Sequence, residues 1–220
     1  MSLTPYIQVN TRYTRSIHIE RDSESSNLPY ILTSRAVQVL ARVADTLDSE
    51  PKPRSFALIG PYGSGKSAFG LFLSQLLGNV DSEATRHART VLEQAVPALA
   101  KNFTASLADT RGYCVVAVTG SPEPLARSLL RAINTAATRF FRGKKKRPAV
   151  LSQLESAFVS GDYKISRLVE LIADLQDAIV DDRGAGLLIV IDELGTAFST
   201  SNGYLIKRGC ARYFFKSETV

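Results

Sequence analysis

Apolar residues follow two patterns along this chain, short continuous runs and longer runs with helical spacing. The continuous runs lie at residues 56–59, 113–119 and 187–191. Such runs are typical of parallel strands that are buried on both faces. Helical periodicity fills the chain between them. The pattern therefore predicts an α/β fold with a mainly parallel sheet and a helical insertion between the first strand and the last.

The longer patterns predict amphipathic helices whose ends carry recognisable signals. The expected helices cover residues 34–47, 69–77, 81–108 with a break near Pro97, 121–141, a short stretch marked by the capping-box spacing of Ser152 and Glu155, and 165–180. Thr33 or Ser34 can act as the N-cap of the first helix. Ser121 can cap the helix after residue 119, with Pro122 as its first residue.

A glycine-rich segment separates the first apolar run from its helix. It reads Gly60-Pro61-Tyr62-Gly63-Ser64-Gly65-Lys66-Ser67-Ala68. The glycines allow the backbone N–H groups to converge on phosphate oxygens, and the dipole of the following helix points at the same phosphates. In such a loop Lys66 reaches the β- and γ-phosphates and the Ser67 hydroxyl ligates Mg²⁺. Residues 60–68 are therefore the predicted phosphate-binding segment.

Two carboxylates, Asp192 and Glu193, directly follow the last apolar run. Ligands of open α/β sheets bind beyond the carboxyl ends of the strands, where the glycine-rich loop is also expected. Asp192 is thus placed to hold Mg²⁺, largely through water. Glu193 is the candidate general base for an attacking water molecule.

The segments GPYGSGKS and LLIVIDELG resemble the Walker A and Walker B boxes of P-loop ATPases of the additional-strand, catalytic-glutamate division, which includes AAA+ and STAND proteins. IDELG with a long helical insertion before it is similar to the nucleotide-binding heads of large bacterial ATP-binding proteins, some from phage-defence or DNA-maintenance systems. The resemblance spans about residues 30–195. It implies a three-layer αβα fold, ATP and Mg²⁺ as cofactors, phosphate and metal contacts from Lys66, Ser67 and Asp192, and catalysis by Glu193.

Residues 6–20 alternate partly between apolar and polar, which favours a strand or hairpin arm. We therefore expect an N-terminal arm at residues 1–29 and a P-loop domain at residues 30–220. Residues 196–220 have room for one or two short strands but for no helical lid and little room for a catalytic arginine. The sequence thus predicts ATP binding with slow hydrolysis, by the head of a larger motor or switch ATPase.

Two other functions fit the loop. A P-loop kinase could use Arg127, Arg131 and Arg139 as lid arginines. A nucleotide-binding module without hydrolysis fits the short tail. The chain has no Asn-Lys-x-Asp motif of GTPases and no Leu-Ser-Gly-Gly signature of transporter ATPases. ATP rather than GTP is implied by the resemblance alone.

Composition adds little to this picture. The formal net charge is +6, and Arg127, Arg131, Arg142 and residues 144–147 could form a DNA-contacting patch, although we favour a solvated helix face. Cys114 and Cys210 are far apart, and no apolar run is long enough to span a membrane, so we expect a cytoplasmic protein. His18 and His87 lie in no metal-binding spacing. A homo-oligomer or larger complex is the expected assembly.

Overall fold

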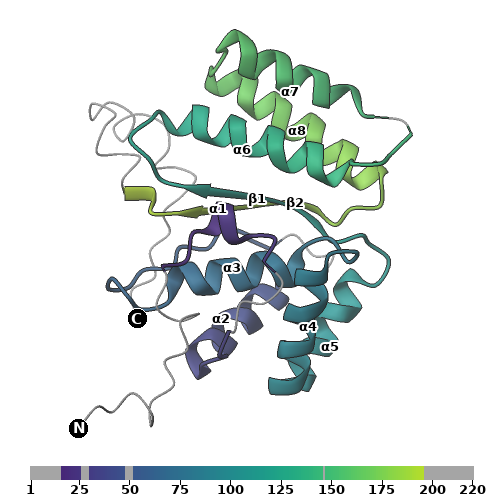
Figure 1. The fold of residues 1–220 in the computed structure, drawn as a ribbon. Coiled ribbons are helices and arrows are strands. Elements are labelled where there is room, and N and C mark those ends of the chain that lie inside the picture. Colours follow the sequence, from purple (N-terminus) through teal and green to yellow (C-terminus); the bar gives the residue numbers. More distant parts are fainter. Residues whose placement is uncertain (1–15, 26–29, 48–51, 146, 196–220) are drawn as a thin grey trace, which may run out of the picture.

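The computed structural model describes residues 16–25, 30–47, 52–145 and 147–195 as an α/β fold with helices on both faces of a small parallel sheet (Figure 1). The elements are α1 (Ile19–Asp22), α2 (Ser34–Ala44), α3 (Lys66–Leu77), α4 (Glu83–Ala95), α5 (Pro97–Leu107), β1 (Tyr113–Thr119), α6 (Leu125–Phe140), α7 (Ala149–Ser160), α8 (Ile165–Asp181) and β2 (Gly186–Asp192). Helices thus fill the chain between the glycine-rich loop and β2, as the apolar pattern predicts. None of the helices in these ranges is both long enough and apolar enough to cross a bilayer.

The sheet of the described chain consists of β1 and β2, which pair in parallel from Tyr113 opposite Gly186 to Thr119 opposite Asp192. Both strands lie where the apolar runs predict them. The pairing is in register throughout, so the two strands end at the same edge of the sheet. Asp192 therefore stands at the carboxyl edge, as expected.

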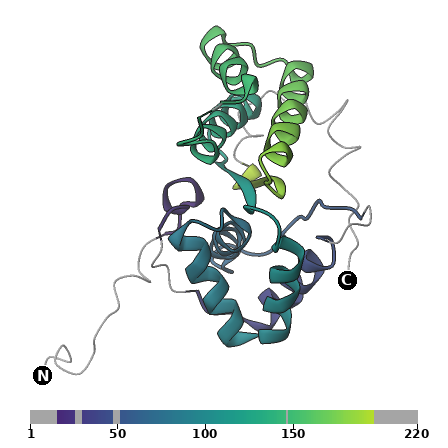
Figure 2. The same cartoon turned by 90° about the vertical axis from the view of Figure 1, so that its right-hand side faces the viewer.

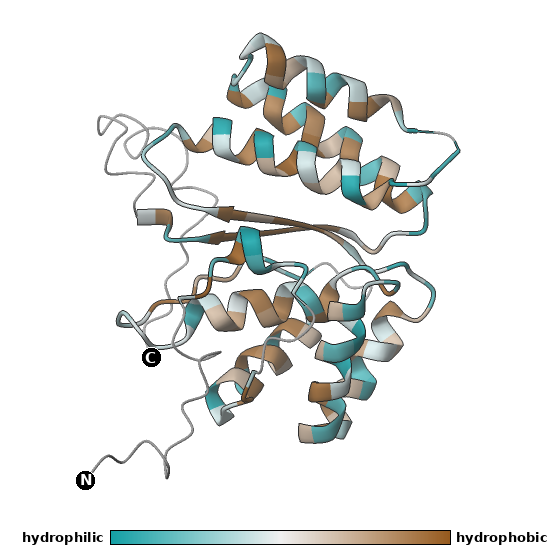
Figure 3. Cartoon of the chain, viewed as in Figure 1, coloured by the Kyte–Doolittle hydropathy of each residue, from teal (hydrophilic) through white to brown (hydrophobic). Residues whose placement is uncertain are grey.

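Each face of the sheet packs against its own group of helices. The side chains of Cys114, Val116 and Val118 are buried among α6, α7 and α8. On the other face Leu188 and Tyr113 contact the core formed by α2, α3, α4 and α5. Figure 2 shows the two groups of helices on opposite sides of the strands, and Figure 3 shows that the strands between them are apolar along most of their length. Burial on both faces explains why the strand sequences are continuous apolar runs rather than alternating ones.

The strand predicted at residues 56–59 is wrong for this structure. Residues 52–60 form neither helix nor strand, and Phe56, Leu58 and Ile59 are exposed, Ile59 to 88%. A strand needs a hydrogen-bonding neighbour, and among the described residues the sheet is complete with β1 and β2. Apolar composition alone did not place this segment in the sheet.

Several helix ends also differ from the prediction. Residues 19 and 20 belong to α1 and not to a strand, while residues 6–15 lie outside the described chain. Helix α6 begins at Leu125 after Pro124, because Ser121 and Glu123 contact one another in a loop instead of capping a helix. Helix α7 begins at Ala149, so Ser152 lies inside it and donates back to the Ala149 carbonyl.

Other helix ends are confirmed. The Thr33 hydroxyl caps α2 by accepting from the Ala36 N–H at 3.2 Å. Pro97 separates α4 from α5, and α8 begins at Ile165 as predicted. Local capping chemistry was therefore a sound guide where the cap contacts its own helix.

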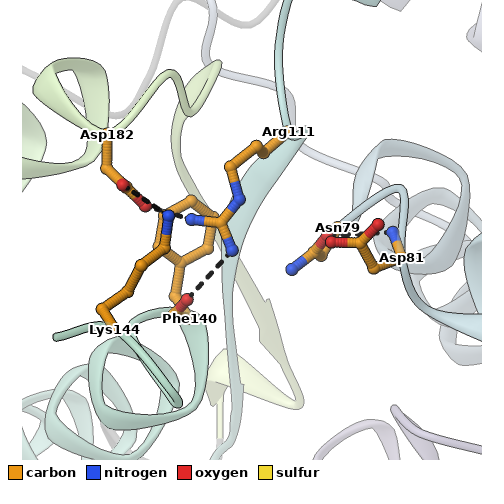
Figure 4. Close-up of polar contacts among 6 residues, drawn as sticks. All are labelled: Asn79, Asp81, Arg111, Phe140, Lys144 and Asp182. Carbon is orange, nitrogen blue, oxygen red and sulfur yellow. Dashed lines mark hydrogen bonds and ion pairs between the residues drawn. The ribbon is translucent and has the colours of Figure 1, made fainter.

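A polar cluster fixes the edge of the sheet at which the strands begin (Figure 4). Arg111, just before β1, forms an ion pair with Asp182 at the end of α8 and lies 4.8 Å from the ring centre of Phe140. Lys144 binds the other oxygen of Asp182 at 2.7 Å. On the far side of Arg111 in this view, Asn79 accepts from the Asp81 N–H at 3.0 Å. The cluster ties α6, α8 and β1 together at the edge opposite Asp192.

Candidate phosphate-binding site

Two glycines of the loop adopt backbone conformations that favour glycine. Gly63 and Gly65 have φ angles of 77° and 84°, in the left-handed region that glycine occupies without strain. A Cβ atom added at either position would meet nothing within 4 Å, so the space in front of both residues is open. Tyr62, directly before Gly63, is 95% exposed. The loop therefore offers room for a ligand close to its backbone.

The Lys66 side chain folds back and binds the backbone of this loop. Its Nζ donates to the carbonyl of Gly60 at 2.9 Å and to that of Pro61 at 2.8 Å, and it lies 3.5 Å from Ser64 Oγ. An ammonium group has three N–H donors and each has an acceptor here, so a bound phosphate would replace one or more of these contacts. This arrangement fixes a positive charge where the loop backbone turns.

Helix α3 begins at Lys66, with Gly65 as its N-cap and no side chain capping its first turn. The first N–H groups of a helix have no partners within the helix and carry the positive end of its dipole. Ser67 and Ala68 are half-buried in this turn. The N–H groups and the Lys66 ammonium together favour a bound anion.

Packing of α3 against the sheet places the loop at the carboxyl edge. Gly78, after the end of α3, lies against Gly112 just before β1, and Gly70 lies against Val190 of β2. Helix α3 therefore runs antiparallel to the strands, and its start and the strand ends lie on the same side (left in Figure 1). Four helical residues and two strand residues each span about 6 Å. Lys66, four residues before Gly70, is thus level with Asp192, two residues after Val190.

Asp192 and Glu193 differ in their surroundings. Asp192 is half-buried, and its Oδ1 accepts from the Glu193 N–H at 3.0 Å. Glu193 is exposed and has a φ angle of 52°, which is unusual for a residue other than glycine. The loop that follows β1 lies close to this turn. A Cβ atom added at Gly120 would lie 2.0 Å from the Glu193 carbonyl oxygen. The turn directs the chain away from the sheet immediately after Asp192.

Three of the arginines that could serve a kinase lid or a DNA patch, Arg127, Arg131 and Arg139, have carboxylate partners. Glu123 pairs with Arg131 at 2.8 Å and with Arg127 at 3.6 Å, and Arg139 pairs with Glu24 at 2.8 Å. A hydrogen bond from the Ser128 hydroxyl, followed by those from Arg131 and Ser121, lowers the pKa of Glu123. These pairs reduce the positive potential that a phosphate backbone would meet on this helix.

Sequence reasoning missed Glu20, which reaches the same edge of the sheet. Its Oε1 accepts from the Thr119 N–H at 2.5 Å, across 99 positions of sequence. Thr119 is the residue of β1 opposite Asp192. Nothing in the pattern around Glu20 marks this role, because the contact depends on how α1 lies against β1.

The oxygen donors near the loop fit Mg²⁺ only together with phosphate. Within the described ranges, no three His, Cys, Asp or Glu side chains are arranged to hold a metal ion. Ser67 and Asp192 supply a hydroxyl and a carboxylate, and Mg²⁺ is commonly held by one or two such protein ligands plus substrate phosphates and water.

Comparisons of the chain with protein-family models, curated proteins and solved structures gave no match.

Proposed function

We propose that this chain binds Mg-ATP through residues 60–68 and hydrolyses it slowly, as the nucleotide-binding head of a larger motor or switch ATPase. The observation that carries the proposal is the Lys66 ammonium, held by the Gly60 and Pro61 carbonyls at the start of α3. A positive charge fixed beside unpaired helix N–H groups, in an open glycine loop, suits a di- or triphosphate.

Each site residue then has a defined task. Lys66 and the first N–H groups of α3 would bind the phosphates, and Ser67 and Asp192 would be the protein ligands of the magnesium ion. When bound, Mg²⁺ neutralises charge on the β- and γ-phosphate oxygens. Glu193 accepts a proton from the attacking water, which its exposed position at the end of β2 allows.

The three-layer P-loop fold is part of the same proposal. The helices on both faces of the parallel pair and the α3–β2 packing support it. Recognition of adenine is supported by the resemblance of the two motifs alone.

Titration of a fluorescent ATP analogue tests the site. Lys66→Ala should remove measurable binding, because it deletes the one side-chain charge within the loop. Lys101→Ala, at an exposed position of α5, is the matched control and should bind like the wild type. Equal affinity of the Lys66→Ala and wild-type proteins would reject the assignment.

Phosphate release separates binding from turnover. Glu193→Gln should bind the analogue normally and lose hydrolysis, since the amide keeps the shape but cannot accept the proton. The wild-type chain should itself turn over slowly, below about 1 s⁻¹ on the usual enzyme scale. Hydrolysis by Glu193→Gln at the wild-type rate would assign the base elsewhere.

A further inference from the structure

The carboxyl edge of β1 is held by a residue from the far N-terminal part of the chain. Thr119 ends β1, and its N–H points away from β2 toward the Glu20 carboxylate, 2.5 Å away. The Thr119 hydroxyl is buried and makes no hydrogen bond within the described structure. A bond from a backbone N–H to an ionised carboxylate is among the stronger hydrogen bonds in proteins. The Glu20 carboxylate is therefore the hydrogen-bond acceptor for the N–H group of Thr119, the last residue of β1.

Glu20 is itself held firmly. Its neighbour Ile19 is fully buried, and Asp22, 2% exposed, accepts from the His18 N–H at 2.9 Å and so closes the single turn of α1. The carbonyl of Ser25 accepts from Gln75 of α3 at 3.0 Å. Segment 16–25 is thus fastened both to the sheet and to the helix that begins with Lys66.

Backbone contacts of Thr119 and Gly120 in turn fix the position of Asp192. Thr119 pairs with Asp192 across the two strands, and the next residue, Gly120, donates its N–H to the Asp192 carbonyl at 2.8 Å. The Gly120 backbone also lies against the Glu193 carbonyl. A shift of the end of β1 would therefore move Asp192 and Glu193 relative to the loop.

We propose that Glu20 is a positioning residue of the nucleotide site, which holds Asp192 level with the start of α3 by anchoring the end of β1. The inference rests on the proposed function, since it assigns Asp192 to the metal. Under this proposal, segment 16–25 helps to position the residues of the nucleotide site. Glu20 acts through Thr119 and Gly120 and does not touch the ligand.

Nucleotide affinity with and without magnesium tests this role. The loop binds phosphate without help from Asp192, so Glu20→Ala should leave the affinity for fluorescent ATP in EDTA unchanged. The gain in affinity on adding Mg²⁺ should fall about tenfold, the lower end of the loss seen when a group that orients a metal ligand is removed. Glu20→Gln keeps an oxygen that can accept from Thr119 and should retain most of the gain. Glu24→Ala, in the same segment but paired to Arg139, is the control and should behave like the wild type.

Two outcomes would overturn the proposal. An equal loss of affinity in EDTA and in Mg²⁺ would show that Glu20 only supports the fold. Loss of the gain in Glu20→Gln, with amide exchange at residues 119 and 120 as in the wild type, would show that Glu20 acts on the metal directly and not through the end of β1.

Amide hydrogen exchange separates this proposal from the proposed function. Glu20→Ala should speed exchange at residues 119 and 120 in the protein without nucleotide, while exchange in α8 stays unchanged. A wild-type chain that fails to bind ATP, with this exchange pattern intact, would reject only the nucleotide site. Unchanged exchange at residues 119 and 120 would reject the anchoring by Glu20.

Discussion

Residues 113–119 and residues 56–59 are both short continuous apolar runs, but they lie in very different surroundings. The first forms β1, with Val116 and Val118 fully buried. The second is irregular, and Ile59 is 88% exposed. Strand β1 has β2 along one edge, α6 on one face and contacts with α3 and α1 besides. Residues 52–60 form no strand pairing within the described chain.

The difference shows that an apolar run specifies a possible strand and its neighbours decide whether one forms. Backbone N–H and C=O groups of a strand must be paired by a second strand before its side chains can be buried at low cost. The pairing of β1 with β2 joins segments about seventy residues apart, and α6 and α8 pack over one face of the pair. Three predictions probe this contrast, in order of decreasing effect.

The largest expected difference between the two apolar runs is in how fast a cysteine in each reacts with a thiol reagent. Burial raises the pKa of Cys114 to about 12, and its side chain is 1% exposed. In a Cys210→Ser background, Cys114 should react with a thiol reagent at pH 8 at least about 10³-fold more slowly than a cysteine introduced by Ile59→Cys, because reaction at β1 requires the core to open. Timed labelling followed by mass spectrometry measures both rates. Similar rates at the two positions would show that β1 is not buried in solution.

Side-chain truncation should separate the two runs by stability. Val116→Ala removes two methyl groups from a fully buried position and should lower the free energy of unfolding by about 2 kcal/mol. Ile59→Ala at the exposed run should change it by less than about 0.5 kcal/mol. Urea denaturation of the three proteins gives both values. A cost at Ile59 as large as that at Val116 would mean that residues 56–59 are buried in the folded protein.

The smallest effect concerns the loop that leaves β1. The Ser128 hydroxyl donates to Glu123 at 2.7 Å and is the main cause of the lowered pKa of that carboxyl. A carboxyl with a lowered pKa stabilises the fold above its ordinary pKa, and this contribution is lost as the pH falls through the lowered value. Ser128→Ala should therefore raise the pKa of Glu123 toward its ordinary value, as measured by carbon-detected NMR titration. An unchanged pKa would show that the arginine pairs alone hold the carboxylate.

Local sequence determined the elements whose contacts lie within a few residues. Thr33 caps α2, Pro97 starts α5, and Gly63 and Gly65 allow the loop that Lys66 closes, because each depends on short-range backbone chemistry. The strands β1 and β2 were also predictable, since continuous apolar runs of that length suit burial on both faces. The motif residues Lys66 and Asp192 were placed at one edge of the sheet by the rule that loops at strand ends converge.

Contacts between distant segments were decided only by the tertiary structure. The Ser121 hydroxyl donates to Glu123 and does not cap a helix, so α6 begins later than its local signals predict. The site position of Glu20 depends on a bond to Thr119 that no local pattern encodes. Residues 56–59 have the composition of a strand but pair with no strand in the described chain. The Glu20–Thr119 bond joins residues 99 positions apart, which only folding brings together.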